Sequence, residues 1–127
     1  MADILAANVT YTETAGTVAR GVPRKGSSRQ IDLSFGDGAL TYNSATNIPL
    51  TKASLGCPTE VQVLKVLSRT TSAAGTNYVW EWDKSAVSPT LVGYEVRTAQ
   101  VGPESLTEIA NGTAIAAQVI RCEVVGY

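Results

Sequence analysis

The residues that could do chemistry in this chain are few, and they form no complete catalytic set. The 127-residue sequence contains no histidine, which excludes Ser-His-Asp and Cys-His catalysis and the commonest zinc ligand. Glu81 and Asp83 would share one face of a strand, about 7 Å apart, near the separation of the two carboxylates in glycosidases. Acids two positions apart are also the ordinary pattern of a solvated strand face. We therefore expect a protein that is not an enzyme and needs no cofactor.

The two cysteines are far apart in the sequence, and neither is marked as a nucleophile. No general base is adjacent to Cys57, and nothing nearby in the sequence would stabilise its thiolate. Cys122 lies in an apolar strand pattern, where a buried free thiol is expected, and a disulfide with Cys57 is the alternative. Two cysteines alone cannot complete a structural zinc site, so we expect no metal centre.

The clearest structural pattern is a stripe of aromatic residues. Every second position of residues 78–83 is aromatic, as in a strand with one buried face: Tyr78, Trp80 and Trp82. A second alternating run, residues 91–97, contains Tyr94, and Pro89 interrupts the stretch between the two runs. The two runs predict a β-hairpin whose four aromatic side chains lie at the centre of the core. If the stripe were exposed, it would instead form a platform for stacking sugars.

Short apolar or alternating runs, separated by turn signals, continue along the rest of the chain. Strands are predicted at residues 8–13, 30–35, 39–42, 61–69 and 114–127, with either a strand or a short helix near residues 103–110. Seven or eight short strands with little helix predict an all-β fold: a single-domain β-sandwich or a small, jelly-roll-like β-barrel. Residues 1–13 would form an N-terminal arm and first strand, and residues 14–127 the β domain.

Composition excludes several classes of partner. The net charge is −1 and only 17% of residues are charged, so no basic surface for nucleic acid is expected. No apolar run approaches the length of about 18 residues that a transmembrane helix needs, so no membrane partner is expected. The N-terminal residues contain an acid and no basic region, unlike a secretory signal. Small and hydroxyl residues predominate instead, which suits a surface that lies against another protein.

Two N-terminal segments are candidates for such a contact. Residues 1–7 form a short apolar arm that includes Ile4 and Leu5. Residues 14–30 contain four basic residues and no acid, and several glycines interrupt them: Arg20, Arg24, Lys25 and Arg29. This stretch is either a solvated loop or a contact with an acidic partner surface.

Five segments are distinctive when taken together: the Ala-Asp-Ile-Leu start, Ile31–Tyr42 (IDLSFGDGALTY), Ile48–Cys57 (IPLTKASLGC), Leu106–Ala110 (LTEIA) and the final Val124–Tyr127 (VVGY). In these segments the chain resembles small structural proteins of tailed bacteriophages that decorate or cement the head. The resemblance extends over nearly the whole chain, and the Phe-Gly-Asp-Gly block is its most telling part.

The resemblance implies a non-enzymatic virion protein, made in the host cytoplasm and added to the capsid surface, where it stabilises the head. Its partner would be the major capsid protein, and such subunits are trimers at local three-fold positions or dimers at two-folds. On this hypothesis Ile4 and Leu5 anchor the arm as an added strand on the shell. The four basic residues would steer it toward an acidic surface, and removing residues 2–7 would leave the stability of the fold nearly unchanged.

Two alternatives remain open at this point. One is a carbohydrate-binding adhesion module that uses the stripe of Tyr78, Trp80 and Trp82. The other is a subunit of the phage tail, although no long hairpin arm for stacking is evident in the sequence.

Overall fold

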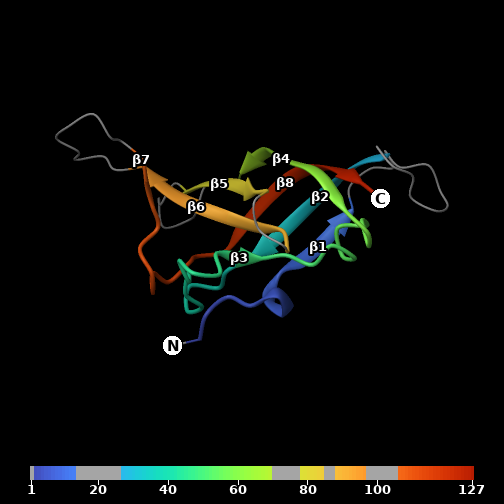
Figure 1. Ribbon diagram of the computed structural model, residues 1–127. Helices are drawn as coiled ribbons and strands as arrows, with labels where there is room; N and C mark the ends of the chain where they lie inside the picture. Colours follow the sequence, from blue (N-terminus) through green and yellow to red (C-terminus); the bar gives the residue numbers. More distant parts are fainter. Residues whose placement is uncertain (1, 14–26, 70–77, 85–87, 97–105) are drawn as a thin grey trace.

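The computed structural model describes residues 2–13, 27–69, 78–84, 88–96 and 106–127. Within these ranges the chain forms eight strands and a single 3-10 turn at Ala6–Asn8. The strands make two antiparallel sheets that pack against each other (Figure 1). The prediction of an all-β sandwich with seven or eight short strands and little helix is confirmed.

The first sheet is built around the C-terminal strand of the chain. Its order is β1 (Thr10–Glu13), β2 (Ser27–Phe35), β8 (Gln118–Gly126) and β4 (Val61–Arg69). β8 therefore pairs with β2 on one side and with β4 on the other. The register shifts twice along β4, between Val61 and Val63 and between Val66 and Ser68, and such bulges bend a strand and increase its twist.

The second sheet contains the predicted hairpin. β5 (Tyr78–Asp83) pairs with β6 (Thr90–Val96) along its whole length. The opposite edge of β6 is shared by two short strands, β3 (Ile48–Pro49) near its start and β7 (Leu106–Glu108) near its end. The segment near residues 103–110, for which a strand and a short helix were both predicted, contains the strand β7. A turn at Asn111 and Gly112 follows it.

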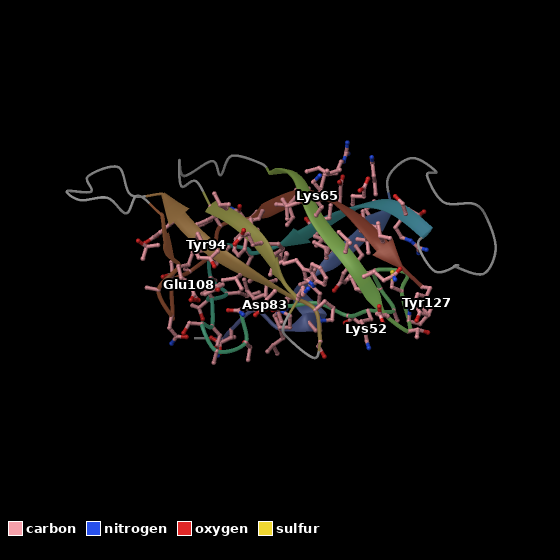
Figure 2. All side chains as sticks on the ribbon, turned by 45° about the horizontal axis from the view of Figure 1, so that its top comes forward. Lys52, Lys65, Asp83, Tyr94, Glu108 and Tyr127 are labelled. Carbon is pink, nitrogen blue, oxygen red and sulfur yellow. The ribbon has the colours of Figure 1, made fainter. Side chains whose placement is uncertain are left out.

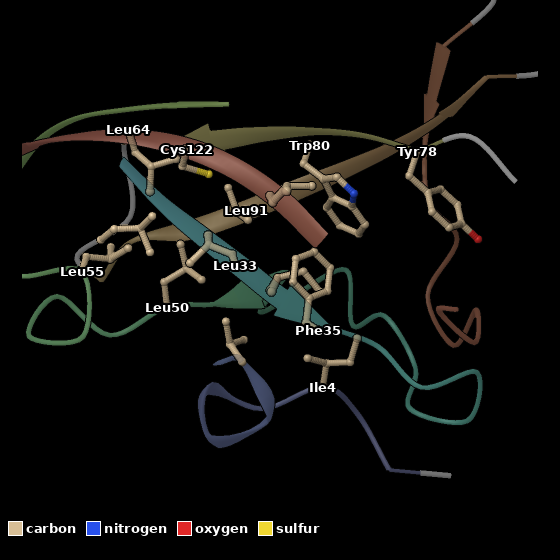
Figure 3. Packing of buried hydrophobic residues seen from close by; sticks show 14 of the residues in the cluster. Ile4, Leu33, Phe35, Leu50, Leu55, Leu64, Tyr78, Trp80, Leu91 and Cys122 are labelled. Atoms are coloured by element: carbon tan, nitrogen blue, oxygen red, sulfur yellow. The ribbon is translucent and has the colours of Figure 1, made fainter. Parts of the chain in front are cut away.

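The core lies between the two sheets, because the inward positions of both are apolar (Figure 3). The first sheet contributes alternate residues of three strands: Ile31, Leu33, Phe35, Leu64, Ile120, Cys122 and Val124. The second sheet and the connecting segments contribute the other side: Tyr78, Trp80, Leu91, Ile48, Leu50, Leu55, Tyr42, Ile109 and Ile115. This alternation is what the period of two in the sequence predicts.

The Phe-Gly-Asp-Gly block ends β2 and leads into a bend at residues 38–40. Oδ1 of Asp37 accepts hydrogen bonds from the backbone N–H groups of Ala39 and Leu40, both at 2.8 Å. These bonds lower the pKa of the Asp37 carboxyl below its ordinary value. Gly36 has a φ of 87°, and a Cβ there would lie 2.6 Å from the carbonyl oxygen of Ala116, so the chain needs glycine at this position.

Candidate functional site

The aromatic stripe is mostly internal. Tyr78 and Trp80 are 5% and 2% exposed, which confirms the prediction that they face the core. Trp80 meets Phe35 edge to face, with ring centroids 4.9 Å apart, and Tyr78 at 5.8 Å. An open sugar platform made of all three rings does not fit this burial. The tail-subunit alternative stays a prediction.

The other two aromatic residues of the hairpin, Trp82 and Tyr94, are only partly buried. Trp82 is partly buried against the core at the end of β5, where part of the ring lines a surface groove. The prediction that Tyr94 joins the core is wrong, because Tyr94 pairs with Val79 and therefore lies on the outer face of the sheet. Burial and the nearby acids Glu81, Glu108 and Asp83 raise the pKa of the Tyr94 hydroxyl.

The predicted anchor Ile4 belongs to the fold and not to a free arm. Its side chain is 1% exposed, and its N–H donates to the carbonyl oxygen of Thr41 at 2.9 Å. Asp3 fixes the same segment, since its carboxylate accepts hydrogen bonds from Asn43 Nδ2 at 2.9 Å and Thr41 Oγ1 at 2.8 Å. These bonds lower the pKa of Asp3. Assigning Ile4 to an interface is therefore a mistake, whereas Leu5, 61% exposed, is free to contact a partner.

Arg29 also departs from its predicted role. Its side chain is only 7% exposed and lies directly over Gly56, where it occupies the space that a Cβ would need. Nε and Nη2 are buried and have no hydrogen-bond partner among the described residues. A guanidinium enclosed in this way cannot act as an exposed steering charge, so the prediction is wrong for this residue. Arg20, Arg24 and Lys25 lie outside the described residues.

The outer face of the first sheet carries most of the large apolar side chains that are exposed in the described part of the chain. Val63 and Leu67 on β4 are each 44% exposed, and Val119 on β8 is 39% exposed. Val125, half-buried, lies directly opposite Val63 on the neighbouring strand. We call these four residues and the charged positions between them the β4–β8 face.

The charged side chains on the β4–β8 face lie next to side chains of opposite charge on the neighbouring strands. The Arg121 guanidinium binds the Asp32 carboxylate with two hydrogen bonds, Nε to Oδ1 at 2.9 Å and Nη2 to Oδ2 at 3.2 Å. This bond raises the pKa of Arg121, which therefore stays charged. Lys65 lies opposite Glu123 across β4 and β8. The face therefore combines exposed apolar groups with two opposite-charge pairs.

Both cysteines are free thiols buried in the core, as the sequence predicts for Cys122. Burial raises the pKa of Cys122 to about 12 and also raises that of Cys57, which the Arg29 charge partly opposes. Neither thiol is activated as a nucleophile in this environment. In the described part of the chain, no cluster of His, Cys, Asp and Glu side chains is arranged to hold a metal ion.

No helix in the ranges that the structure covers is long and apolar enough to cross a membrane. Comparisons with protein-family models, curated proteins and solved structures gave no match. The function is therefore inferred from the surfaces of the molecule itself.

Two of these surfaces, the β4–β8 face and the groove at Trp82, were not predicted from the sequence. Val63, Leu67 and Val119 belong to runs that are apolar on both faces, so alternation alone did not show which side chains would stay exposed. The position of Trp82 at the open end of a strand depends on where β4 lies, which no local pattern reveals. Leu5 was the only predicted contact residue that the structure leaves exposed in its described ranges.

Proposed function

We propose that this protein is a non-enzymatic virion structural protein that binds the outer surface of a phage capsid and stabilises the head. The proposal joins the resemblance of the sequence to head decoration proteins with one observation, the β4–β8 face. Val63, Leu67 and Val119 present apolar groups on long paired strands instead of on loops. A surface of this kind is suited to lie against another protein.

The charge arrangement supports binding of the same face to a protein surface. Desolvating an unpaired charge is costly, but Asp32 and Arg121 already satisfy each other, and Lys65 stands opposite Glu123. If a partner protein covered this face, each of these four charged side chains would still have a side chain of opposite charge nearby. The outer side of the other sheet has a different character, because acids surround Tyr94 there: Glu81, Asp83 and Glu108. We propose that the β4–β8 face is directed to the shell and the acidic side away from it.

The partner in this proposal is the major capsid protein, and the protein acts as a homo-oligomer, a trimer at three-fold positions or a dimer at two-fold positions. Leu5, exposed beside the sandwich, would provide an additional contact. Weak binding by each copy is sufficient, because several linked contacts raise the overall affinity by avidity. The protein would be made in the host cytoplasm and reside on the capsid surface.

Co-sedimentation with purified heads that lack the protein tests this proposal. The wild-type protein should pellet with heads, whereas Val63→Lys and Val119→Lys should each weaken binding by about tenfold or more, since each places an unpaired charge in a closed contact. Val79→Lys on the outer side of the other sheet is the matched control and should bind as the wild type does. Failure of the wild type to pellet would refute capsid binding, and full binding by both lysine variants would refute the proposed face.

A further inference from the structure

β4 of one sheet and β5 of the other lie next to each other at the open side of the sandwich (Figure 2). A groove there is lined by residues of both strands and of the segments before β4 and after β5. It consists of two hollows of about 490 Å³ and 300 Å³. The larger one lies within the range of small-molecule sites, roughly 300–1,000 Å³. Trp82 lines both hollows, so the two adjoin at this ring.

Trp82 is placed in the groove by the geometry of β5. It shares a strand face with Tyr78 and Trp80, which are buried, but it is near the end of the strand where it is only partly covered. One part of the indole packs against the core and holds the ring, while another part forms the groove wall. A ring that is fixed in this way presents an apolar surface at little cost in side-chain entropy.

The walls around the larger hollow are mainly polar and offer both hydrogen-bond donors and acceptors. Lys52 and Lys84 bring ammonium groups, Glu60 a carboxylate, and Gln62 an amide. Lys52 is positioned by the carbonyl oxygen of Thr59, which lies 3.4 Å from its Nζ. Glu81 and Lys65, which belong to the outer faces of β5 and β4, border the smaller hollow. Its other lining residues are apolar or aromatic: Leu64, Val66, Trp80 and Trp82.

We infer that this groove is a saccharide-binding site in which a sugar ring stacks on Trp82. A sugar ring has an apolar face of C–H groups and an edge of hydroxyls that both donate and accept hydrogen bonds. The apolar face matches the indole, and the hydroxyls match the lysines, Glu60 and Gln62. The second hollow, next to Glu81 and Lys65, would hold a further ring of the same chain. This inference is independent of the proposed binding to a capsid.

An extended peptide is the competing occupant of a groove between two strands, and the structure disfavours it. Strand addition needs a regular row of backbone groups along the wall. The β4 wall is interrupted by two register shifts, at Val61/Val63 and Val66/Ser68, which are features that protect an edge from further pairing. Most of the residues that line the larger hollow are polar.

Proton–nitrogen NMR of the full chain provides a direct test, because two tryptophans give two indole N–H signals. Cellobiose, chitobiose, lactose and maltose would be titrated separately, together with a Val-Thr repeat peptide. At least one disaccharide should shift the Trp82 indole signal in a saturable manner, and by more than that of Trp80, which lines the smaller hollow but is only 2% exposed. Trp82→Phe removes one indole signal and so assigns the two, and it should weaken binding several-fold when binding is followed by the backbone amide signals instead.

Trp82→Ala should weaken it by about tenfold or more, and Lys84→Ala, which leaves the core untouched, should also weaken it. Tyr94→Ala, on the outer side of the same hairpin, is the matched control and should bind as the wild type does. No shift with any sugar would overturn the inference. A shift of Trp82 by the peptide alone would also overturn it and assign the groove to strand addition.

Discussion

The indole of Trp80 lies against the backbone of Gly93 on the neighbouring strand, in the space that a side chain at position 93 would occupy. A Cβ there would lie 2.5 Å from Cζ3 of Trp80 and 2.6 Å from Cδ1 of Ile109. Gly93 is therefore required by the packing of the ring, since it is not at one of the positive-φ positions. This close approach gives the Trp80 indole, the largest side chain of the core, the space that it needs.

Gly93→Ala should lower the free energy of unfolding by about 1–3 kcal/mol, because the added methyl group overpacks a rigid interior. Chemical denaturation measures the change. Gly112→Ala is a useful comparison, because no atom lies within 4 Å of its Cβ and only the φ of 87° opposes alanine, at a cost of about 1 kcal/mol. The double variant Gly93→Ala/Trp80→Phe should be less destabilised than the sum of the single changes, and strict additivity would contradict the proposed clash.

The N-terminal segment should contribute to stability. Ile4→Ala is expected to cost about 2–5 kcal/mol, because it empties a position that is 1% exposed. Leu5→Ala, on the neighbouring exposed residue, should change stability by less than about 0.5 kcal/mol. Thermal denaturation of both variants distinguishes a docked segment from a free arm, for which the two costs would be similar and small.

Tyr42 should make stability depend on pH in the alkaline range. Its hydroxyl lies 3.0 Å from Asn47 Oδ1 and accepts the Gly93 N–H at 3.2 Å. Burial raises the pKa of Tyr42 from 10.0 to about 12, an effect that the Gly93 N–H opposes and the Glu108 charge increases. Between these two values the folded state holds a proton that the unfolded state has lost, so stability falls as the pH rises.

Tyr42→Phe removes both the hydroxyl and this titration. At neutral pH it should cost about 1–3 kcal/mol, since the buried Gly93 N–H loses its acceptor. The difference in the free energy of unfolding between wild type and variant should then become smaller as the pH rises from 10 toward 12. Urea denaturation at each pH measures this difference. A difference that stays constant across this range would contradict the raised pKa.

Arg29 should be replaceable by an apolar residue of similar length. Its buried Nε and Nη2 have no partner, so the charge is desolvated without compensation from the described residues. Arg29→Met keeps the aliphatic stem over Gly56 and should leave the free energy of unfolding equal or raise it by about 1–4 kcal/mol. A loss of stability of more than about 2 kcal/mol would show that the guanidinium has a favourable partner.

Local patterns predicted most of the strands, because alternation and burial coincide where one face of a strand is covered. The strand predicted at residues 39–42 is wrong, because this segment makes only isolated bridges at Thr41. Tyr78 and Trp80 are buried as the period of two requires. Burial of Tyr94 was mispredicted because the relative phase of two paired strands is set by their register, and Val79 stands opposite it.

The candidate surfaces were harder to predict than the strands. Ile4 looked like part of a mobile arm because its partner Thr41 lies far along the chain. Arg29 looked exposed because a charged residue usually is, and its position over Gly56 depends on a turn that no neighbouring residue specifies. The groove at Trp82 arises only when β4 and β5, from different sheets, lie next to each other. Contacts between distant segments therefore decide the surfaces, whereas nearby residues decide the strands.

The central place of β8 has a consequence for how the chain assembles. Ile31 pairs with Cys122, and Leu33 with Ile120, so the middle of the first sheet closes only when segments about ninety positions apart meet. A fragment that stops at residue 117 would leave β2 and β4 without a neighbour between them, and both would offer bare edges to other chains. Truncated products of this protein should therefore accumulate as aggregates instead of as partly folded monomers.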